Sequence, residues 1–371
     1  MTPQHMDDGL SAEAASARVR LVQGLADAGA LTDPAWRSAF VHVPRDAFVP
    51  YFYDHAGSLI SRDDPETAAE WFTAVHENRA LVTHRTNGAA TSSTSQPSVM
   101  AVMLEALAAE DGMTVLEIGT GTGYNAALLA HRLGDVHVVT IDLTTDITAA
   151  ARDRLAATGR SPLVVTGDGA AGYPERAPYD RIIATCRLRT IPPALTEQLT
   201  DSGLIVTPLG NALARIHRTG LATAEGRFLP DGAFFMPLRH PGEASLPSRP
   251  QLPTKPGRPS TLPATALADN SFRFLASIVE PDLTWQYDLG DDQQISGARV
   301  WSTDGSIAHL HTDTSVSETG PRPLWRNLED AHTFYQEAGE PSPDRYGVTI
   351  EGQMQRVWFN DPDGPSWTLH P

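Results

Sequence analysis

Three glycines at alternate positions form the segment of the sequence that most clearly indicates a ligand-binding site. Gly119, Gly121 and Gly123 follow an apolar run that contains Glu117, and Thr120 lies between the first two glycines. Glycine lets the backbone turn sharply and approach a ligand that leaves no room for a Cβ atom. The third glycine comes too early for the dinucleotide-binding pattern, so the segment is either another kind of ligand loop or a purely structural turn.

One carboxylate stands where the next predicted strand ends. Asp142 follows the apolar run 136–141, about twenty residues after the glycines, where a carboxylate can accept hydrogen bonds from both hydroxyls of a ribose. Asp142 is therefore the predicted ribose ligand, with Leu143 beside it. The alternative role for Asp142 is an N-cap of the helix expected after Thr144.

A second carboxylate, Asp168, lies between Gly167 and Gly169 after the apolar run 163–166. Ligands of open α/β sheets bind in the crevice at the carboxyl ends of the strands. We therefore expect these three residues to lie at the same ligand-binding edge as Asp142.

A run of small hydroxyl residues precedes an apolar helix predicted over 99–107. It contains Ser93, Thr94 and Ser95, and Gln96 follows them. The hydroxyls can position a substrate, and serine and threonine also cap helices well. Both roles are compatible with the sequence.

The elements that must position these residues alternate along the chain. Apolar runs typical of strands cover 114–118, 136–141, 163–166, 181–185 and 204–208, and helical patterns cover 126–133 and 147–156. This alternation predicts βαβ units and a doubly wound, mostly parallel sheet with helices on both faces. Upstream, residues 11–28 predict an amphipathic helix capped by Ser11 and stopped at Gly29. Residues 41–50 are too rich in proline for a regular element and predict an ordered connector.

A proline-rich segment divides the chain into two predicted domains. Residues 1–240 form the first domain, 241–265 form an extended linker, and 266–371 form a smaller α+β module. In this module we expect strands over 272–279 and 283–289, a hairpin from 300–302 and 308–311, and a helix over 328–338.

Composition excludes several classes of function. The 28 Lys and Arg against 45 Asp and Glu give a formal charge of -17, which disfavours nucleic acid as a partner. The only cysteine, Cys186, permits no intramolecular disulfide, and we expect it to pack rather than react. His309 and His311 share a strand face but lack a third ligand, so we expect no metal site. No signal peptide or run of about eighteen apolar residues occurs, which predicts a soluble, cytoplasmic protein without a membrane span. The sequence does not indicate an oligomeric state.

Several further segments follow one another in an order and spacing that, with the glycine loop, form a recognisable series of motifs. They cover 43–50, 91–97, 179–185, 191–195 and 202–208. Together with the glycine loop, they make roughly the first 240 residues resemble the protein-L-isoaspartate O-methyltransferases. The resemblance implies a Rossmann-like class I methyltransferase fold that uses S-adenosylmethionine (AdoMet) as its cofactor.

The resemblance also implies roles for individual residues. The glycine loop with Glu117 is similar to the first AdoMet motif of such enzymes, and Asp168 and Gly169 would lie beside the adenine. Ser95 corresponds to the family's hydroxyl residue near the transferred methyl group. The neighbouring substrate-side residues would be Ser93, Thr94 and Gln96.

Methyl transfer to a carboxylate requires no general base, because a carboxylate with a pKa near ~4 is already ionised at neutral pH. This fits the lack of a convincing acid–base dyad in the sequence. The resemblance implies methylation of an aspartyl or isoaspartyl carboxylate in a peptide or protein. The ester would then close to a succinimide.

The chain continues past Leu238, beyond the point where ordinary members of the family end. Extended relatives encoded beside ribosomally made peptides methylate one aspartate of a modified precursor, as in lanthipeptide-type pathways. The extension and the serine-rich segment 91–97 favour this tailoring role over general repair of isoaspartyl damage. A non-catalytic scaffold for AdoMet and peptide, and methylation of a small-molecule carboxylate, are the other hypotheses.

Overall fold

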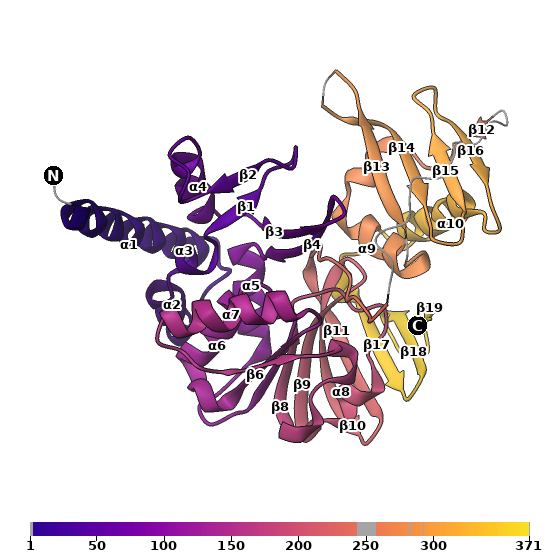
Figure 1. The fold of residues 1–371 in the computed structure, drawn as a ribbon. Helices are drawn as coiled ribbons and strands as arrows, with labels where there is room; N and C mark the ends of the chain where they lie inside the picture. The colour runs from indigo at the N-terminus through magenta and orange to yellow at the C-terminus, as the bar shows by residue number, and fades with distance from the viewer. Residues whose placement is uncertain (1–2, 243–256, 282, 292, 371) are drawn as a thin grey trace.

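The fold is described from a computed structural model that covers residues 3–242, 257–281, 283–291 and 293–370. The central part of the expected linker, residues 243–256, lies outside the described residues. The chain forms a large α/β unit with a small N-terminal sheet on one side and a C-terminal α+β module on the other (Figure 1).

The N-terminal region contains more regular structure than the sequence predicts. Helix α1 begins at Pro3, not at Ser11, and ends at Asp27 as expected before Gly29, whose φ is +74°. The expected irregular connector 41–50 is wrong in detail, because it includes the end of one helix and a short helical turn. The remaining elements before residue 95 are α2 (Pro34–His42), α3 (Arg45–Phe48), α4 (Ala68–Val75), and the sheet of β1 (Tyr51–Tyr53), β2 (Leu59–Ser61), β3 (Leu81–Thr86) and β4 (Ala89–Thr94).

The large sheet begins with the five strands that the periodicity predicts. These are β5 (Val115–Ile118), β6 (Val138–Asp142), β7 (Leu163–Thr166), β8 (Tyr179–Ala184) and β9 (Leu199–Leu209), which lie in the order β7-β6-β5-β8-β9 and pair in parallel. The predicted helices are α5 (Pro97–Leu107), α6 (Tyr124–Leu133) and α7 (Thr145–Ala157), and α8 (Pro193–Glu197) completes this region.

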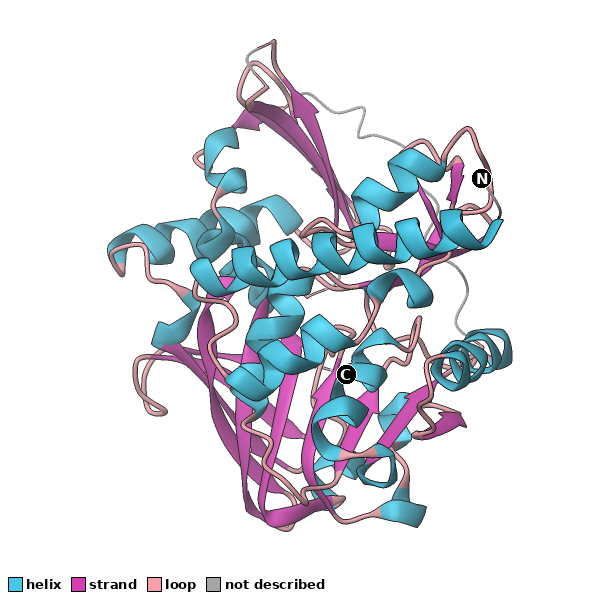
Figure 2. Cartoon of the chain, turned by 90° about the vertical axis from the view of Figure 1, so that its left-hand side faces the viewer, coloured by secondary structure: helices cyan, strands magenta, loops and turns pink. Residues whose placement is uncertain are grey.

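Strand alternation directs the apolar side chains of the large sheet into two separate cores. In β5, Val115 belongs to the core that includes the N-terminal helices, whereas Leu116 and Ile118 belong to the opposite core. Successive strand residues point to opposite faces, so a strand that is covered on both faces carries apolar side chains on each of them. Figure 2, viewed from the side of α1, shows the N-terminal helices in front of the strands.

The large sheet continues with antiparallel strands and is therefore mixed rather than mostly parallel. Strands β10 (Ala212–Gly220) and β11 (Thr223–Gly232) follow β9, and β17 (Tyr346–Glu351), β18 (Met354–Phe359) and β19 (Ser366–Leu369) extend the same sheet from β11. The predicted boundary at residue 266 is thus wrong for the last part of the chain. Main-chain pairing with β11 places these last strands in the first domain.

The C-terminal module consists of a second sheet and two helices. Its sheet has the order β12-β16-β15-β14-β13, and the elements are β12 (Arg258–Pro259), α9 (Asn270–Val279), β13 (Thr284–Leu289), β14 (Ile295–Trp301), β15 (Ile307–Leu310), β16 (Ser315–Thr319) and α10 (Leu324–Glu337). The expected strand 283–289, the hairpin and the second helix are confirmed within a few residues. The end of the expected linker belongs to this module, because β12 pairs with β16 and Leu262 is buried.

The expected strand over 272–279 is wrong, because this segment is helix α9. The side chain of Asp269 accepts hydrogen bonds from the backbone N–H groups of Ser271 and Phe272 and so caps the helix. The buried side chains on α9 include Phe272, Leu275 and Ala276. These positions recur at the spacing of one helix face.

The module shares its core with the large sheet. The ring of Phe274 on α9 lies 4.7 Å from that of Phe228 on β11 and 5.2 Å from that of Tyr346 on β17. The side chain of Ser277 accepts a hydrogen bond from the backbone of Asn211, in the turn between β9 and β10. Helix α9 is therefore fixed to the sheet that carries the predicted site.

Candidate functional site

A cavity of about 1030 Å³ opens at the carboxyl ends of the parallel strands. Its lining includes Ile118 and Gly119 after β5, Asp142 after β6, Gly169 after β7 and Thr185 after β8. Strand β4, helix α5 and the segment 229–239 form the other walls, and Asn270 of the C-terminal module completes the lining. Sequence segments far apart along the chain thus meet at one edge of the sheet.

The glycine loop borders this cavity as predicted. Gly119 and Gly121 line it with φ values of +95° and +51°, in the left-handed region that favours glycine. Gly123 has a φ of +89° but lies at the start of α6, where an added Cβ would come within 3.4 Å of the side chain of Ala151. The hydroxyl of Thr120 is buried. Two of the three glycines therefore border the cavity, and the third permits close packing of helices.

Glu117 lies beneath the loop and not in the cavity lining. Its carboxylate is fully buried and accepts hydrogen bonds from Asn125 Nδ2 at 2.7 Å and from Thr140 Oγ1 at 2.6 Å. The hydroxyl of Thr140 also lies 2.7 Å from that of Thr120 in the loop. Burial raises the pKa of Glu117 to about 7. The geometry gives Glu117 the role of an anchor that ties β5, β6 and α6 to the glycine loop.

Asp142 lies where a ribose ligand is expected. Its Oδ2 accepts a hydrogen bond from the backbone N–H of Gly121 at 2.9 Å, and its Oδ1 accepts one from that of Leu143 at 2.8 Å. Both Asp142 and Leu143 line the cavity. Asp142 is not the N-cap of α7, because Thr144 occupies that position. The capping alternative for Asp142 is therefore wrong.

In the segment around Asp168, the backbone at Gly169 borders the cavity, whereas the Asp168 carboxylate does not. Gly169 lines the cavity, and an added Cβ there would lie 2.5 Å from Ile118 Cγ2. The side chain of Asp168 accepts a hydrogen bond from the backbone of Ala170 and lies 3.6 Å from His240 Nδ1. Asp168 and Gly167 are not among the lining residues.

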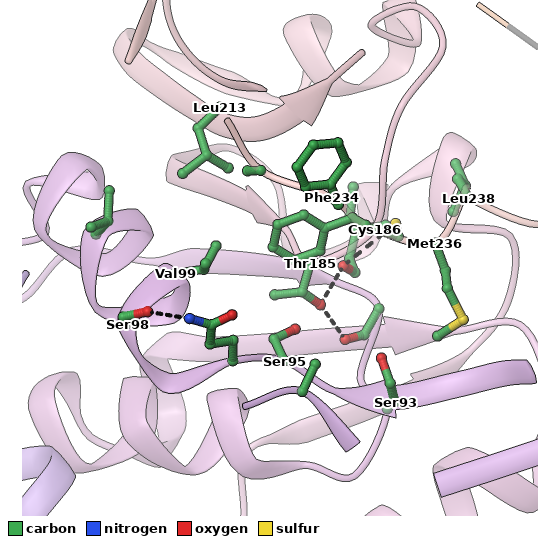
Figure 3. A pocket seen from close by; sticks show the side chains of 18 of the residues that line it. Ser93, Ser95, Ser98, Val99, Thr185, Cys186, Leu213, Phe234, Met236 and Leu238 are labelled. Atoms are coloured by element: carbon green, nitrogen blue, oxygen red, sulfur yellow. Dashed lines mark hydrogen bonds between the residues drawn. The ribbon is translucent and has the colours of Figure 1, made fainter. Parts of the chain in front are cut away.

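The predicted substrate-side segment is partly a strand, because β4 continues to Thr94. Ser93, Ser95 and Gln96 line the cavity, whereas Thr94 is buried away from it. Figure 3 shows Ser95 below Thr185 and Val99 of α5 in this view. Gln96 is the N-cap residue of α5, without a side-chain capping bond, so the hydroxyl residues do not cap the helix. The capping alternative is wrong here too.

The segment 229–239 is the main part of the site that the sequence did not predict. Figure 3 shows Phe234 and Met236 beside the cavity, and Phe234 is 47% exposed. The backbone of Arg187 exchanges hydrogen bonds with Met236 and Leu238, which holds this segment over the end of β8. Arg239 approaches Asp142 within 3.9 Å. Two adjacent aromatic residues between prolines, outside any predicted strand, were the only signal in the sequence.

Among the described residues, the cysteine and the histidine pair that the sequence analysis considered show no sign of a catalytic or metal-binding role. Burial raises the pKa of the Cys186 thiol to about 12, with further contributions from Asp142 and Glu117. The rings of His309 and His311 lie 4.0 Å apart. Within the described part of the chain, no three His, Cys, Asp or Glu side chains gather as a metal site requires. Likewise, none of the described helices is long and apolar enough to cross a membrane.

The arrangement fits AdoMet. Glycines at Gly119 and Gly121 leave space where Cβ atoms would stand, and the Asp142 carboxylate faces the same cavity. The cavity extends from these residues to Ser93 and Ser95, so a cofactor and a second reactant can share it.

Comparisons with known proteins agree with this assignment. The profile of the family described as Protein-L-isoaspartate(D-aspartate) O-methyltransferase (PCMT) matches residues 16–221. The chain is 37% identical over 234 residues to the protein-L-isoaspartate O-methyltransferase of Methylorubrum extorquens (strain PA1), covering 62% of this chain and 92% of that protein. It is 34% identical over 228 residues to the enzyme of the same name from Methanothermobacter thermautotrophicus, covering 60% of this chain and 94% of that protein.

A solved structure titled protein-L-isoaspartate O-methyltransferase has a similar fold, with a TM-score of 0.55 and 20% identity. The match covers 93% of this chain and 100% of that one, so the similarity in fold extends into the C-terminal region. The cavity at the glycine loop, the similar relatives and the matched profile lead to one conclusion: the chain belongs to the protein-L-isoaspartate(D-aspartate) O-methyltransferase family and is an AdoMet-dependent methyltransferase with a class I fold.

Proposed function

We propose that this enzyme methylates the side-chain or α-carboxylate of an aspartyl or isoaspartyl residue in a peptide or protein. The observation that carries the proposal is the continuous lining from the glycine loop to Ser95. Among the described residues, the hydroxyl of Ser95 has no hydrogen-bond partner and therefore remains available to a substrate oxygen. The family's name matches this activity, and protein or peptide substrates fit a cavity that opens between several elements.

For this reaction the protein mainly has to align the substrate carboxylate with the methyl group of AdoMet. AdoMet supplies an electrophilic methyl group, so a carboxylate oxygen gains the O–CH3 bond while the S–CH3 bond breaks and its electron pair stays on sulfur. No proton moves, because the carboxylate is already ionised. Ser95 would orient the carboxylate, and Phe234 and Leu213 would exclude water. Such alignment can lower the barrier by about 7–11 kcal/mol.

The ester prepares a second reaction in the substrate. The following backbone nitrogen attacks the ester carbonyl and expels methanol, which gives a succinimide. Hydrolysis of the succinimide then yields aspartyl or isoaspartyl products. The enzyme needs to make only the ester.

We further propose that the substrate is a modified ribosomal peptide, of the lanthipeptide type, recognised in part through the C-terminal module. Asn270 of this module lines the cavity, which supports a contact with substrate. General repair of isoaspartyl damage is the second candidate. It is favoured by the solved structure of the same family name, whose similarity in fold covers 93% of this chain. The extension alone therefore does not separate the two candidates.

The test follows methyl label from AdoMet into three substrates. These are an unmodified isoaspartyl peptide, its aspartyl counterpart and a modified precursor peptide from a neighbouring gene. The label should be released by base as methanol, as expected of an ester, and Ser95→Ala serves as the control with impaired transfer. Labelling of the isoaspartyl peptide indicates repair, and labelling of the precursor alone indicates tailoring. An enzyme that binds S-adenosylhomocysteine (AdoHcy) but labels none of the three would contradict the proposal.

A further inference from the structure

Helix α9 brings one arginine of the C-terminal module to the rim of the cavity. Asn270, the first residue of α9, lines the cavity, and Arg273 lies three residues later on the same side of the helix. The guanidinium Cζ of Arg273 lies 4.1 Å from the ring centroid of Phe234, which itself lines the cavity. The guanidinium of Arg273 thus contacts a side chain that lines the cavity.

The position of Arg273 is fixed by the large sheet. Its backbone oxygen accepts a hydrogen bond from Asn211 Nδ2, in the turn between β9 and β10. The neighbouring Ser277 holds the backbone N–H of the same residue at 2.9 Å. The backbone of Arg273 is therefore fixed relative to the large sheet.

Arg273 has no carboxylate partner among the described residues, which distinguishes it from other arginines of the module. Arg258 pairs with Glu318 and Glu329, and Arg299 pairs with Asp288. The contacts of the Arg273 guanidinium are instead with aromatic rings, at 4.1 Å from Phe234 and 5.7 Å from Tyr287. Arg273 is therefore a cation beside the cavity whose guanidinium is not neutralised by a described carboxylate.

The aromatic contacts prepare the guanidinium for an anion. Stacking on a ring face fixes the plane of the group and leaves its edge N–H donors free for a bidentate carboxylate. Phe234 is 47% exposed, so a ligand at this rim would also cover apolar surface that water now contacts. Charge and apolar surface thus lie together beside the cavity.

We propose that Arg273 binds a second carboxylate of the substrate, located a few residues from the carboxylate that is methylated. This inference rests on the proposed function in that the substrate is a peptide. The second carboxylate is an acidic side chain or the C-terminal carboxylate of the peptide, since both present the same group. Arg273 would then give the C-terminal module a defined part in choosing which residue enters the cavity.

The test measures binding to the complex of the full chain with AdoHcy, so it does not depend on turnover. The probes are isoaspartyl hexapeptides with blocked ends that carry Glu or Gln at each flanking position, and one peptide with a free or an amidated C-terminus. Wild-type enzyme should bind one acidic member at least about tenfold more tightly than its neutral partner, as expected of a charged hydrogen bond. The difference should fall below about twofold in Arg273→Gln and be intermediate in Arg273→Lys, which keeps the charge but not the planar fork.

A matched control distinguishes carboxylate binding by Arg273 from a general effect of removing an arginine that stacks on an aromatic ring. Arg227 lies 4.3 Å over the ring of Trp358 and is not part of the cavity lining, so Arg227→Gln should retain the preference. Unchanged AdoHcy affinity in each variant shows that the site is folded.

The proposal is overturned if wild-type enzyme binds both members of every pair equally or binds none of them. It is also overturned if Arg273→Gln or Arg273→Lys keeps the full wild-type preference. Methylation of the same peptides is measured separately. A clear preference for the acidic peptide, with no methyl transfer to the hexapeptides or to the precursor peptide, would refute the proposed function and leave the role of Arg273 intact.

Discussion

Replacing Glu117 by Gln should remove most of one pH-dependent contribution to stability. The carboxylate is completely buried below the glycine loop, and its two hydrogen bonds come from Asn125 and Thr140. Glutamine has nearly the same shape and can keep both contacts, because the Thr140 hydroxyl can accept from the new amide and donate to Thr120. The substitution therefore changes the charge with little change in packing.

The sign and size of the effect follow from the raised pKa. The carboxyl of Glu117 has a pKa of about 7 in the folded protein, against 4.5 for an ordinary glutamate. Between these values the folded state holds the proton and the unfolded state has lost it, so the free energy of unfolding decreases as the pH rises. The contribution is fully present below about pH 4.5 and lost above about pH 7. It amounts to about 3 kcal/mol.

Urea unfolding at several pH values between 5 and 8, followed by circular dichroism, tests this expectation. Glu117→Gln should lose less stability than the wild type over this range, by about 2–3 kcal/mol. Glu70→Gln, at an exposed position on α4, should follow the wild-type pH dependence. If the free energy of unfolding changed with pH in the same way for the wild type and Glu117→Gln, the assignment of a buried, proton-binding carboxylate would be refuted.

Three further substitutions examine the cavity. Asp142→Asn should weaken AdoHcy binding at least about tenfold by calorimetry, because charged hydrogen bonds to the ribose are lost, whereas the exposed Asp146→Asn should not. Gly169→Ala should lower the free energy of unfolding by about 1–3 kcal/mol and weaken AdoHcy binding, since its Cβ would meet Ile118; unchanged values in both measurements would contradict this. Ser95→Ala should reduce kcat/KM for methyl transfer at least about tenfold while thermal unfolding stays nearly unchanged, and full activity would exclude the assigned contact.

The parallel half of the fold could be predicted because each of its elements carries a local signal. The strand that ends at Ile118 carries apolar side chains on both faces, and the glycines that follow it leave few other conformations than a tight loop. The carboxyl ends of parallel strands lie at one edge, so the position of Asp142 beside the loop followed from the same reasoning. The close placement of Asp142 and the glycine loop was predicted for this reason.

Other parts depend on contacts that a local pattern does not contain. The apolar run 272–279 is short enough for either a strand or a helix, and the capping bonds of Asp269 favour the helix. Strand β17 pairs with β11 across more than a hundred residues of chain, which no periodicity reveals. Phe234 lines the cavity only because the segment after β11 folds back over the end of β8.

The pairing of β11 with β17 also decides how the C-terminal region must be studied. A chain cut near residue 240 would leave β11 as an open edge and remove the buried side chains of Tyr346, Val348 and Val357 from the core. It would also remove Phe274, which packs against Phe228. Loss of activity in such a truncation would therefore report loss of fold and not loss of substrate recognition. Recognition by the C-terminal module can be separated from stability only with single substitutions at its cavity-facing surface in the full chain.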